Sequence, residues 1–278
     1  MSVKIVVDST ADLPQQLAKD MGITVVPCYV RFGDQSFRDR VDISEDAFFE
    51  RLQSDSVHPS TSQPSPQDFI GIYQQFADND DGIYSLCVSR KLSGTYDSAF
   101  QARQLLKLAT PIEVVDSYSV TIGLGILAVL AARLSQEGRT LPQIADAVQE
   151  AIPQIHLLGF FDTLKYLAAG GRIGKAKALL GSVLNVKPVL TVKDGELHPA
   201  GQVRSRAKGI DRLIEYVKSF ENIRDLGVIH ATTPDDAHNL ADKLGEYFPR
   251  ERIVISRLGA AIGAHAGPGT LFVAVRGN

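Results

Sequence analysis

The sequence has few cysteines and no long hydrophobic run. Each of these two features excludes certain classes of protein. Cys28 and Cys87 are its two cysteines, too few for the disulfide framework of a small secreted protein and without the paired spacing of a metal site. We expect both to be core residues. The longest apolar stretch, Val120 to Ala132, is shorter than the roughly 20 residues that a membrane-spanning helix needs. MSVKIVVDST is typical of a strand and its turn and not of a signal peptide, so we expect a cytoplasmic protein without stable membrane insertion.

Two common enzyme motifs are also missing. Residues 170–177, GGRIGKAK, resemble a phosphate-binding loop, but that motif needs glycine where the chain has Ala169 and serine or threonine where it has Ala176. Ser93 lies in Lys-Leu-Ser-Gly-Thr, which is not the G-x-S-x-G sequence of a nucleophile elbow. The function therefore has to be sought in other residues.

The chain is long enough for a substantial core. Its 278 residues, 44% of them hydrophobic, suffice for one large or two medium domains. In the first half, short β-branched strands alternate with helices, which is typical of a parallel sheet covered on both faces. The expected strands are 4–8, 83–88 and 112–116, and the expected helices are 13–21, 93–108 and 120–136. Val-Val-Asp-Ser occurs at 6–9 and at 114–117, where two of these strands end, so we expect the same turn chemistry at both.

The second half mixes hairpins with helices. Lys193-Asp194-Gly195 separates two apolar runs and predicts a β-hairpin, while Gly170-Gly171 predicts the end of a helix near 163–169. Further helices are expected at 175–184, 205–219 and 234–247, and further strands at 226–231, 253–258 and 271–275. We therefore predict an α/β fold with two domains: a parallel-sheet α/β domain at 1–155, and an α+β domain with a mixed or antiparallel sheet at 156–278.

Residues 58–69, HPSTSQPSPQDF, contain more hydroxyl groups than local structure needs. Ser65, followed by Pro66 and Asp68, has the features of a helix start: a hydroxyl cap, proline at the first position and an acid in the first turn. Thr61 and Ser62 have no such local role, so their hydroxyls require another explanation.

Other positions are candidates for a binding or catalytic site. Ser9 and Ser117 follow strands of the expected parallel sheet, where ligands bind. Ser93 is either a helix N-cap or a ligand contact, and Gly94 would let a ligand approach the helix dipole. His265 lies in GAAIGAHAGPGT, which we expect to be a loop. It is either a turn histidine or a donor to a ligand, and without a partner at ligand spacing we expect no metal.

Positive charge is concentrated in the second half. Residues 163–210 contain nine lysine and arginine residues against two acidic ones, a formal charge of +7 in a chain whose net charge is −3. The segment is either a solvated helix face or a docking surface for an acidic partner. Nucleic acid is the weaker candidate partner, because Tyr166 is the one aromatic residue that interrupts the run.

Seven motifs in order span nearly the whole chain: VVDSTADLP, STSQPSP, LSGTYDSA, VVDSYS, LKYLAAGGRIG, LLNVKPVL and GAHAGPGT. With these motifs the chain resembles the DegV family of bacterial fatty-acid-binding proteins. The resemblance implies two α/β domains and an acyl chain in a tunnel between or beneath them. It also implies a protein with neither catalytic machinery nor a cofactor of its own, which holds a long-chain fatty acid for a separate ATP-dependent fatty acid kinase that makes the acyl-phosphate.

The resemblance gives roles to individual residues. The fatty-acid carboxylate would be bound by Thr61, Ser93 and His265. Ser62 is expected to shape the loop that carries Thr61. Further candidates for the pocket are Ser9, Ser62, Gly94 and Thr95. Two arginines would lie near the surface that faces the kinase or accepts the phosphate, Arg172 and Arg204. Two residues that differ from the family's usual serine and glycine would alter the pocket's entrance, Arg90 and Lys91.

Three functions remain open on the sequence. The first is a fatty-acid carrier that does no chemistry itself. The second is a serine hydrolase that acts on acyl esters through Ser93 and His265, with Asp8 or Asp116 as the orienting acid. The third is a regulatory or nucleic-acid-binding module that uses the basic segment.

Overall fold

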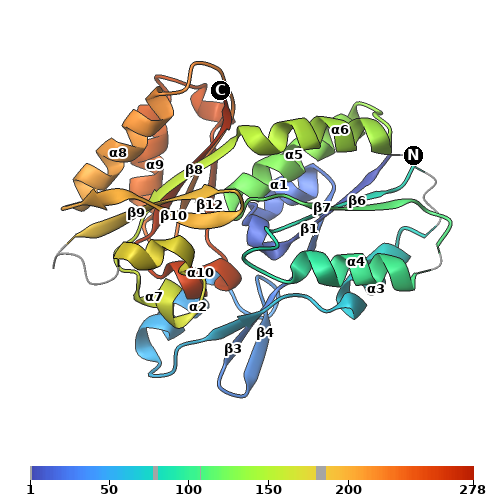
Figure 1. Ribbon diagram of the computed structural model, residues 1–278, viewed down its shortest axis with the longest axis horizontal. Helices are drawn as coiled ribbons and strands as arrows, with labels where there is room; N and C mark the ends of the chain where they lie inside the picture. The colour runs from blue at the N-terminus through green and yellow to red at the C-terminus, as the bar shows by residue number, and fades with distance from the viewer. Residues whose placement is uncertain (1, 78–80, 107, 180–185) are drawn as a thin grey trace.

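The chain folds into three β-sheets with helices packed between and around them (Figure 1). The structure is a computed structural model that describes residues 2–77, 81–106, 108–179 and 186–278. The first half contains β1 (Lys4–Asp8), α1 (Gln15–Asp20), β2 (Ile23–Val26), β3 (Tyr29–Phe32), β4 (Gln35–Arg38), α2 (Glu45–Ser54), β5 (Ser60–Ser62), α3 (Pro66–Gln74), β6 (Ile83–Cys87), α4 (Thr95–Leu105), β7 (Ile112–Asp116), α5 (Ile122–Gln136) and α6 (Leu141–Ala151). The second half contains β8 (Ile155–Phe160), α7 (Lys165–Ala169), η3 (Gly174–Leu179), β9 (Lys187–Lys193), β10 (Glu196–Val203), α8 (Arg206–Lys218), β11 (Ile223–His230), α9 (Pro234–Leu244), β12 (Val254–Arg257), α10 (Ala260–Ala266) and β13 (Leu271–Gly277).

The first sheet is parallel, with the strand order β2-β1-β6-β7. Successive side chains of a strand alternate between its two faces. In β1, Val6 packs with residues of α3 and α4, whereas Ile5 and Val7 pack with residues of α5. Both faces are therefore covered by helices, and the predicted parallel sheet is confirmed.

The second sheet is mixed, with the strand order β10-β9-β8-β13-β11-β12. Its strand pairs are antiparallel except β11 with β12. The predicted hairpin joins β9 to β10 through Asp194 at φ 52° and Gly195 at φ 77°, the left-handed conformation that a tight two-residue turn requires. α8 and α9 cover one face of this sheet.

The third sheet, β4-β3-β5, follows from no pattern that we recognised in the sequence. Its strands have three or four residues, too few to show an alternation. The helix start after it is as predicted: Ser65 caps α3, and Asp68 accepts a hydrogen bond from the backbone N–H of Ser65 at 2.7 Å. Thr61 lies in β5, so it is held by strand pairing just before this cap.

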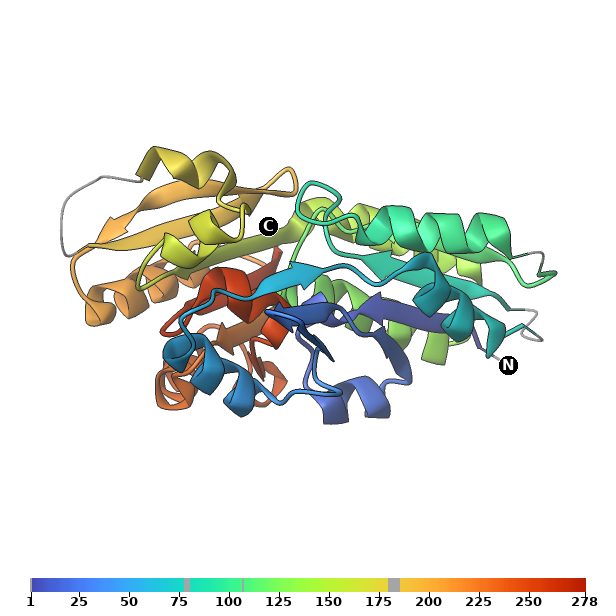
Figure 2. The same ribbon diagram turned by 90° about the horizontal axis from the view of Figure 1, so that it is seen from below.

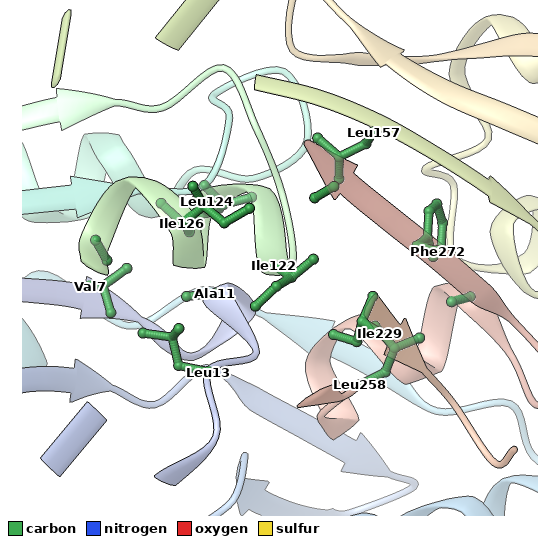
Figure 3. Close-up of a cluster of buried hydrophobic side chains, with 14 of the residues drawn as sticks. Val7, Ala11, Leu13, Ile122, Leu124, Ile126, Leu157, Ile229, Leu258 and Phe272 are labelled. Atoms are coloured by element: carbon green, nitrogen blue, oxygen red, sulfur yellow. The ribbon is translucent and has the colours of Figure 1, made fainter. Parts of the chain in front are cut away.

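A continuous hydrophobic core joins the two large sheets (Figure 3). Ile122 of α5 lies between Val7 of β1 on one side and Leu157 of β8 and Phe272 of β13 on the other. The second sheet begins with β8, at the predicted boundary. Because the core contains residues of both halves, the division into two domains at residue 155 stays a prediction.

The expectation that His265 lies in a loop is wrong, because residues Ala260–Ala266 form α10. Figures 1 and 2 show α10 between α7 and α2. Gly263 permits this packing, since a Cβ there would be 2.7 Å from the Phe48 ring and 2.9 Å from the Phe49 ring. The helix predicted at 175–184 is a 3₁₀ helix over Gly174–Leu179, and its remainder lies outside the described residues.

Three observations concern the absences noted in the sequence. Cys28 and Cys87 are free and buried, as predicted for core residues. In the described parts of the chain, no helix has both the length and the hydrophobicity that crossing a membrane requires. Within the same residues, no three histidine, cysteine or acidic side chains gather as a metal site would need.

Candidate functional site

One cavity is lined by residues of the second and third sheets and by residues from the segments that follow strands of the first sheet. The empty space inside it and at its open mouth together amounts to about 770 Å³. Most of its wall is apolar. The lining residues are Thr10, Cys28, Thr61, Ser62, Gln63, Val88, Leu92, Ser93, Val120, Thr121, Phe161, Leu167, Arg172, Leu197, Ala261, Ile262, His265, Ala266 and Phe272.

Thr61 and His265 form a hydrogen-bonded pair in the wall of this cavity. Thr61 Oγ1 and His265 Nε2 are 2.8 Å apart. Burial is the main cause that lowers the pKa of His265 to about 4, and the positive charge of Arg172 and the nearby His58 contribute to this shift. His265 is therefore neutral at pH 7, with one ring nitrogen that donates and one that accepts.

The ring of His265 is held by the close approach of Gly170. A Cβ at position 170 would be 2.0 Å from His265 Nδ1, so only glycine leaves room for the imidazole. His265 Nδ1 itself is buried and has no hydrogen-bond partner among the described residues. The ring thus has one committed nitrogen, which faces Thr61, and one whose hydrogen-bonding capacity is unused.

Ser93 is not the N-cap of α4, so that interpretation is wrong. The N-cap residue is Gly94, and Ser93 Oγ lies 2.9 Å from the hydroxyl oxygen of Thr95. Either hydroxyl can be the donor. Ser93 can therefore accept from Thr95 and use its own hydrogen toward a molecule in the cavity.

Arg172 is positioned by the end of α7. Gly171 has φ 68°, and the N–H of Arg172 donates to the carbonyl of Leu167 at 3.1 Å, which is the pattern of a Schellman helix end and confirms the predicted glycine stop. The guanidinium donates to the carbonyls of Gly170 at 2.9 Å and Leu92 at 3.3 Å. This exposed cation therefore lies at the cavity mouth.

The other residues predicted for the pocket differ in whether they line the cavity. Ser62 lines the cavity, whereas Ser9, Gly94 and Thr95 are not part of the lining that the structure describes. Ser9 is buried, donates to Asp39 at 2.8 Å and accepts from the backbone N–H of Cys28 at 3.0 Å. Its hydroxyl is thus used within the protein.

Of the cations in the basic segment, Arg172 is the one that lines the described cavity. Arg204 is exposed and is not among the described lining residues. Several other cations of the segment pair with acids: Lys187 with Asp162, Arg206 with Asp236, and Lys175 with Glu196. Tyr166 is 7% exposed and packs against Gly267 and the ring of His58, so the aromatic of the segment presents no free face for stacking on a base.

The two Val-Val-Asp-Ser segments share one predicted feature, a hydrogen bond to the aspartate, but their backbones then differ: Ser9–Ala11 forms a 3₁₀ helix, whereas Tyr118 has φ 50°. Asp8 accepts a hydrogen bond from the N–H of Thr10 at 3.0 Å, and Asp116 accepts one from the N–H of Tyr118 at 2.9 Å. Asp8 is fully buried and also binds the Thr10 hydroxyl and the N–H of Val88. Desolvation raises its pKa, and these hydrogen bonds oppose that rise.

Two threonines in the wall escaped the sequence analysis. Thr10 donates its hydroxyl to Asp8, and Thr121 donates its hydroxyl to Asp12 at 2.8 Å. Burial raises the pKa of Asp12 to about 7, against the opposing effect of Arg40. Thr121 and Asp12 are 109 positions apart, so no local pattern could reveal that the Thr121 hydroxyl is engaged. Apolar lining residues such as Phe272 carry no signal that separates them from core.

Comparison with known families shows which family the chain belongs to. A family model described as "Uncharacterised protein, DegV family" matches residues 2–277. The chain belongs to the DegV family. A DegV domain-containing protein of Caldanaerobacter subterraneus subsp. tengcongensis is 36% identical to it over 270 residues, which cover 96% of this chain and 95% of that protein.

Solved structures of DegV proteins share the fold. A DegV family protein of Thermus thermophilus, described with the words "Fatty Acid Binding", is 33% identical, has a TM-score of 0.91 and matches over 100% of both chains. A protein of Thermotoga maritima, whose structure is described as revealing a fatty acid binding function, is 30% identical with a TM-score of 0.88, again over 100% of both chains. The predicted α/β fold class is thereby confirmed.

Proposed function

We propose that this chain binds a long-chain fatty acid in the cavity, with the carboxylate against Thr61, Ser93 and His265 and the acyl chain along the apolar wall. The observation that carries the proposal is the convergence of these three side chains, from β5, the start of α4 and α10, on one mostly apolar cavity. The fatty-acid binding described for the DegV proteins of Thermus thermophilus and Thermotoga maritima supports it.

The energetics divide between the two ends of such a ligand. Burial is worth about 0.8 kcal/mol for each methylene, so a dozen give roughly 10 kcal/mol before ordering costs. A hydrogen bond to a charged head group adds about 1.5–3 kcal/mol. The chain therefore dominates affinity, while the polar side chains orient the acid and prevent burial of an unpaired carboxylate.

Native mass spectrometry of the purified chain, followed by titration of delipidated protein with saturated acids of increasing length, tests this proposal. We expect a copurified fatty acid and a Kd that falls roughly fourfold for each added methylene until the cavity is filled. The methyl ester of the same acid is the matched ligand, and it should bind more weakly because its head group is neutral. A delipidated protein that ignores every acid in the series would refute the proposal.

We further propose that the chain presents the bound carboxylate to a separate ATP-dependent fatty acid kinase. Arg172 at the cavity mouth and the basic segment around it support a surface that meets an anionic group. In an assay of ATP-dependent acyl-phosphate formation with a purified fatty acid kinase, Arg172→Ala should lose most activity and keep its lipid affinity. Lys193→Ala, which removes the same charge from the same segment, is the control. Equal loss of binding and phosphorylation in Arg172→Ala would contradict the proposed division.

The hydrolase alternative finds less support in the geometry. In such an enzyme the nucleophile is hydrogen-bonded to the base, and the base is hydrogen-bonded to an orienting acid. Here the hydroxyl of Ser93 is hydrogen-bonded to the hydroxyl of Thr95, and Nε2 of His265 is hydrogen-bonded to the hydroxyl of Thr61. Asp8 and Asp116, the two acids considered from the sequence, bind backbone N–H groups of their own turns. Turnover of acyl esters that Ser93→Ala abolishes would revive this alternative.

A further inference from the structure

The helix that carries His265 is held at its opposite end by two buried carboxylates. Asp39 accepts a hydrogen bond from the N–H of Ala260 at 2.7 Å, and Asp12 accepts one from the N–H of Gly259 at 2.7 Å. These N–H groups belong to the first turn of α10, where a helix offers no internal acceptor.

This contact is tight and closed to solvent. Asp39 is 1% exposed, and a Cβ at Gly259 would be 2.8 Å from its Oδ1. Its other oxygen accepts from the hydroxyl of Ser9 at 2.8 Å. Burial raises the pKa of Asp39, whereas the nearby guanidinium of Arg40 and the hydrogen bonds to the carboxylate lower it. Both oxygens of the Asp39 side chain therefore have hydrogen-bond partners, one in the first turn of α10 and one in Ser9.

The held end and the histidine are close enough to move together. α10 has seven residues, and Ala260 and His265 are separated by roughly 8 Å of helix at 1.5 Å per residue. Gly263 packs on Phe48 and Phe49 along the side of the helix. A displaced first turn would therefore shift His265 relative to Thr61 in β5.

We propose that Asp39 is a positioning residue for the carboxylate site: its side chain fixes the first turn of α10 through hydrogen bonds and, through that turn, the placement of His265 beside Thr61. Asp39 does not line the cavity as described, so its effect on a ligand passes through α10. Asp12 shares the task but also binds the cavity-lining Thr121, which makes Asp39 the cleaner subject for a test. The inference rests on the proposed binding of a fatty acid.

The test compares palmitic acid with hexadecanol, which has the same chain length and no carboxylate. In delipidated Asp39→Asn, the affinity for palmitic acid should fall by roughly tenfold, the effect of about one hydrogen bond to a charged group. The affinity for hexadecanol should stay within about threefold, since burial of the chain is unchanged. The imidazole NMR signals of His265 should also shift, which a loss of stability alone would not produce.

Asp225→Asn is the matched control. Asp225 is another buried acid, in β11, paired with Arg133 at 2.7 Å and Arg276 at 2.6 Å, and it does not line the described cavity. Its substitution should lower stability and leave the ratio of acid to alcohol affinity unchanged.

The outcomes separate this inference from the proposed function. If the wild-type chain binds neither compound, the proposed function fails. If it binds palmitic acid and Asp39→Asn leaves the ratio unchanged, the positioning role is wrong. Should Asp39→Asn not fold, Gly259→Ala decides by the same ratio, because it places a methyl group against the same carboxylate.

Discussion

Two sets of hydroxyl groups border the same cavity, and their hydrogen-bond partners differ. Thr61 is bonded to an imidazole nitrogen and Ser93 to another hydroxyl, partners that can exchange donor and acceptor roles. Thr10 and Thr121 instead donate to acidic side chains, which fixes the direction of their hydrogens. The first set is free to rearrange around a ligand, and the second is not.

The difference shows that residue type alone does not mark a binding site. Asp8 and Asp12 are 0% and 1% exposed, and a buried acid needs hydrogen-bond donors around it. Thr10 and Thr121 satisfy that need, so they contribute to the wall without offering a hydrogen to the ligand. A hydroxyl in this wall can donate to a ligand only where no buried acid already accepts its hydrogen bond.

The largest expected effect comes from removing one of these acids. Asp8→Ala leaves the N–H and hydroxyl of Thr10 and the N–H of Val88 without their acceptor. At about 1–3 kcal/mol for each unsatisfied buried group, we expect a loss of roughly 3–5 kcal/mol in unfolding free energy, measured in urea. Asp116→Ala removes the half-buried acid of the matching turn and should cost roughly 1 kcal/mol. Equal losses would show that burial does not distinguish the two turns.

A second prediction replaces threonine by valine in each of the two sets of hydroxyl groups. Thr61→Val removes a donor and leaves the His265 nitrogen unpaired, so the Kd for palmitic acid should rise by roughly 30–100-fold, or 2–3 kcal/mol. Thr10→Val should change this Kd by less than about threefold while lowering stability by roughly 1–2 kcal/mol. Isothermal titration of both variants is the measurement. The comparison breaks if Thr10→Val weakens binding as much as Thr61→Val.

A third prediction uses opposite pH dependences. His265 has a pKa lowered to about 4, so the unfolded chain binds its proton more readily and stability falls as the pH drops from 7.5 to 5. The difference in unfolding free energy between wild type and His265→Gln should shrink by roughly 2 kcal/mol over this range. Asp12, with a pKa raised to about 7, favours the folded state at low pH and loses that advantage as the pH rises toward 7. For Asp12→Asn the difference should therefore change in the opposite direction, and the same sign in both variants would contradict this assignment.

The smallest effect is expected at Ser62. This exposed residue borders the cavity but has no hydrogen bond to its hydroxyl within the described structure. Ser62→Ala should leave stability and the Kd for palmitic acid within about 0.5 kcal/mol of wild type. A tenfold loss of affinity, measured as for Thr61→Val, would place Ser62 among the ligand-binding hydroxyls.

Much of the fold could be predicted from the sequence because its buried strands have a strong local pattern. β1, β6 and β7 are short and mostly apolar, and the helices between them have enough length to be recognised. α10 has a weaker signal: it is only seven residues long and has a glycine in its middle, which disfavours a helix. The packing of Gly263 on Phe48 and Phe49 holds the helix in its place.

The site was predictable in part. Thr61, Ser93 and His265 were identified from the family resemblance, whereas their own local patterns left an N-cap and a turn histidine open. The roles of Asp12 and Asp39 depend on contacts with α10 that span 247 and 221 positions. No spacing rule reaches so far, so these roles required the three-dimensional structure.

The absence of a side chain at Gly170 has an evolutionary consequence. Since a single methyl group there would overlap the imidazole of His265, the two positions are expected to change together among DegV proteins. Relatives that retain histidine at the second position should retain glycine at the first, and those that have lost the histidine should tolerate alanine or serine in place of the glycine. An exchange in a lineage would then mark the point at which its ligand preference changed.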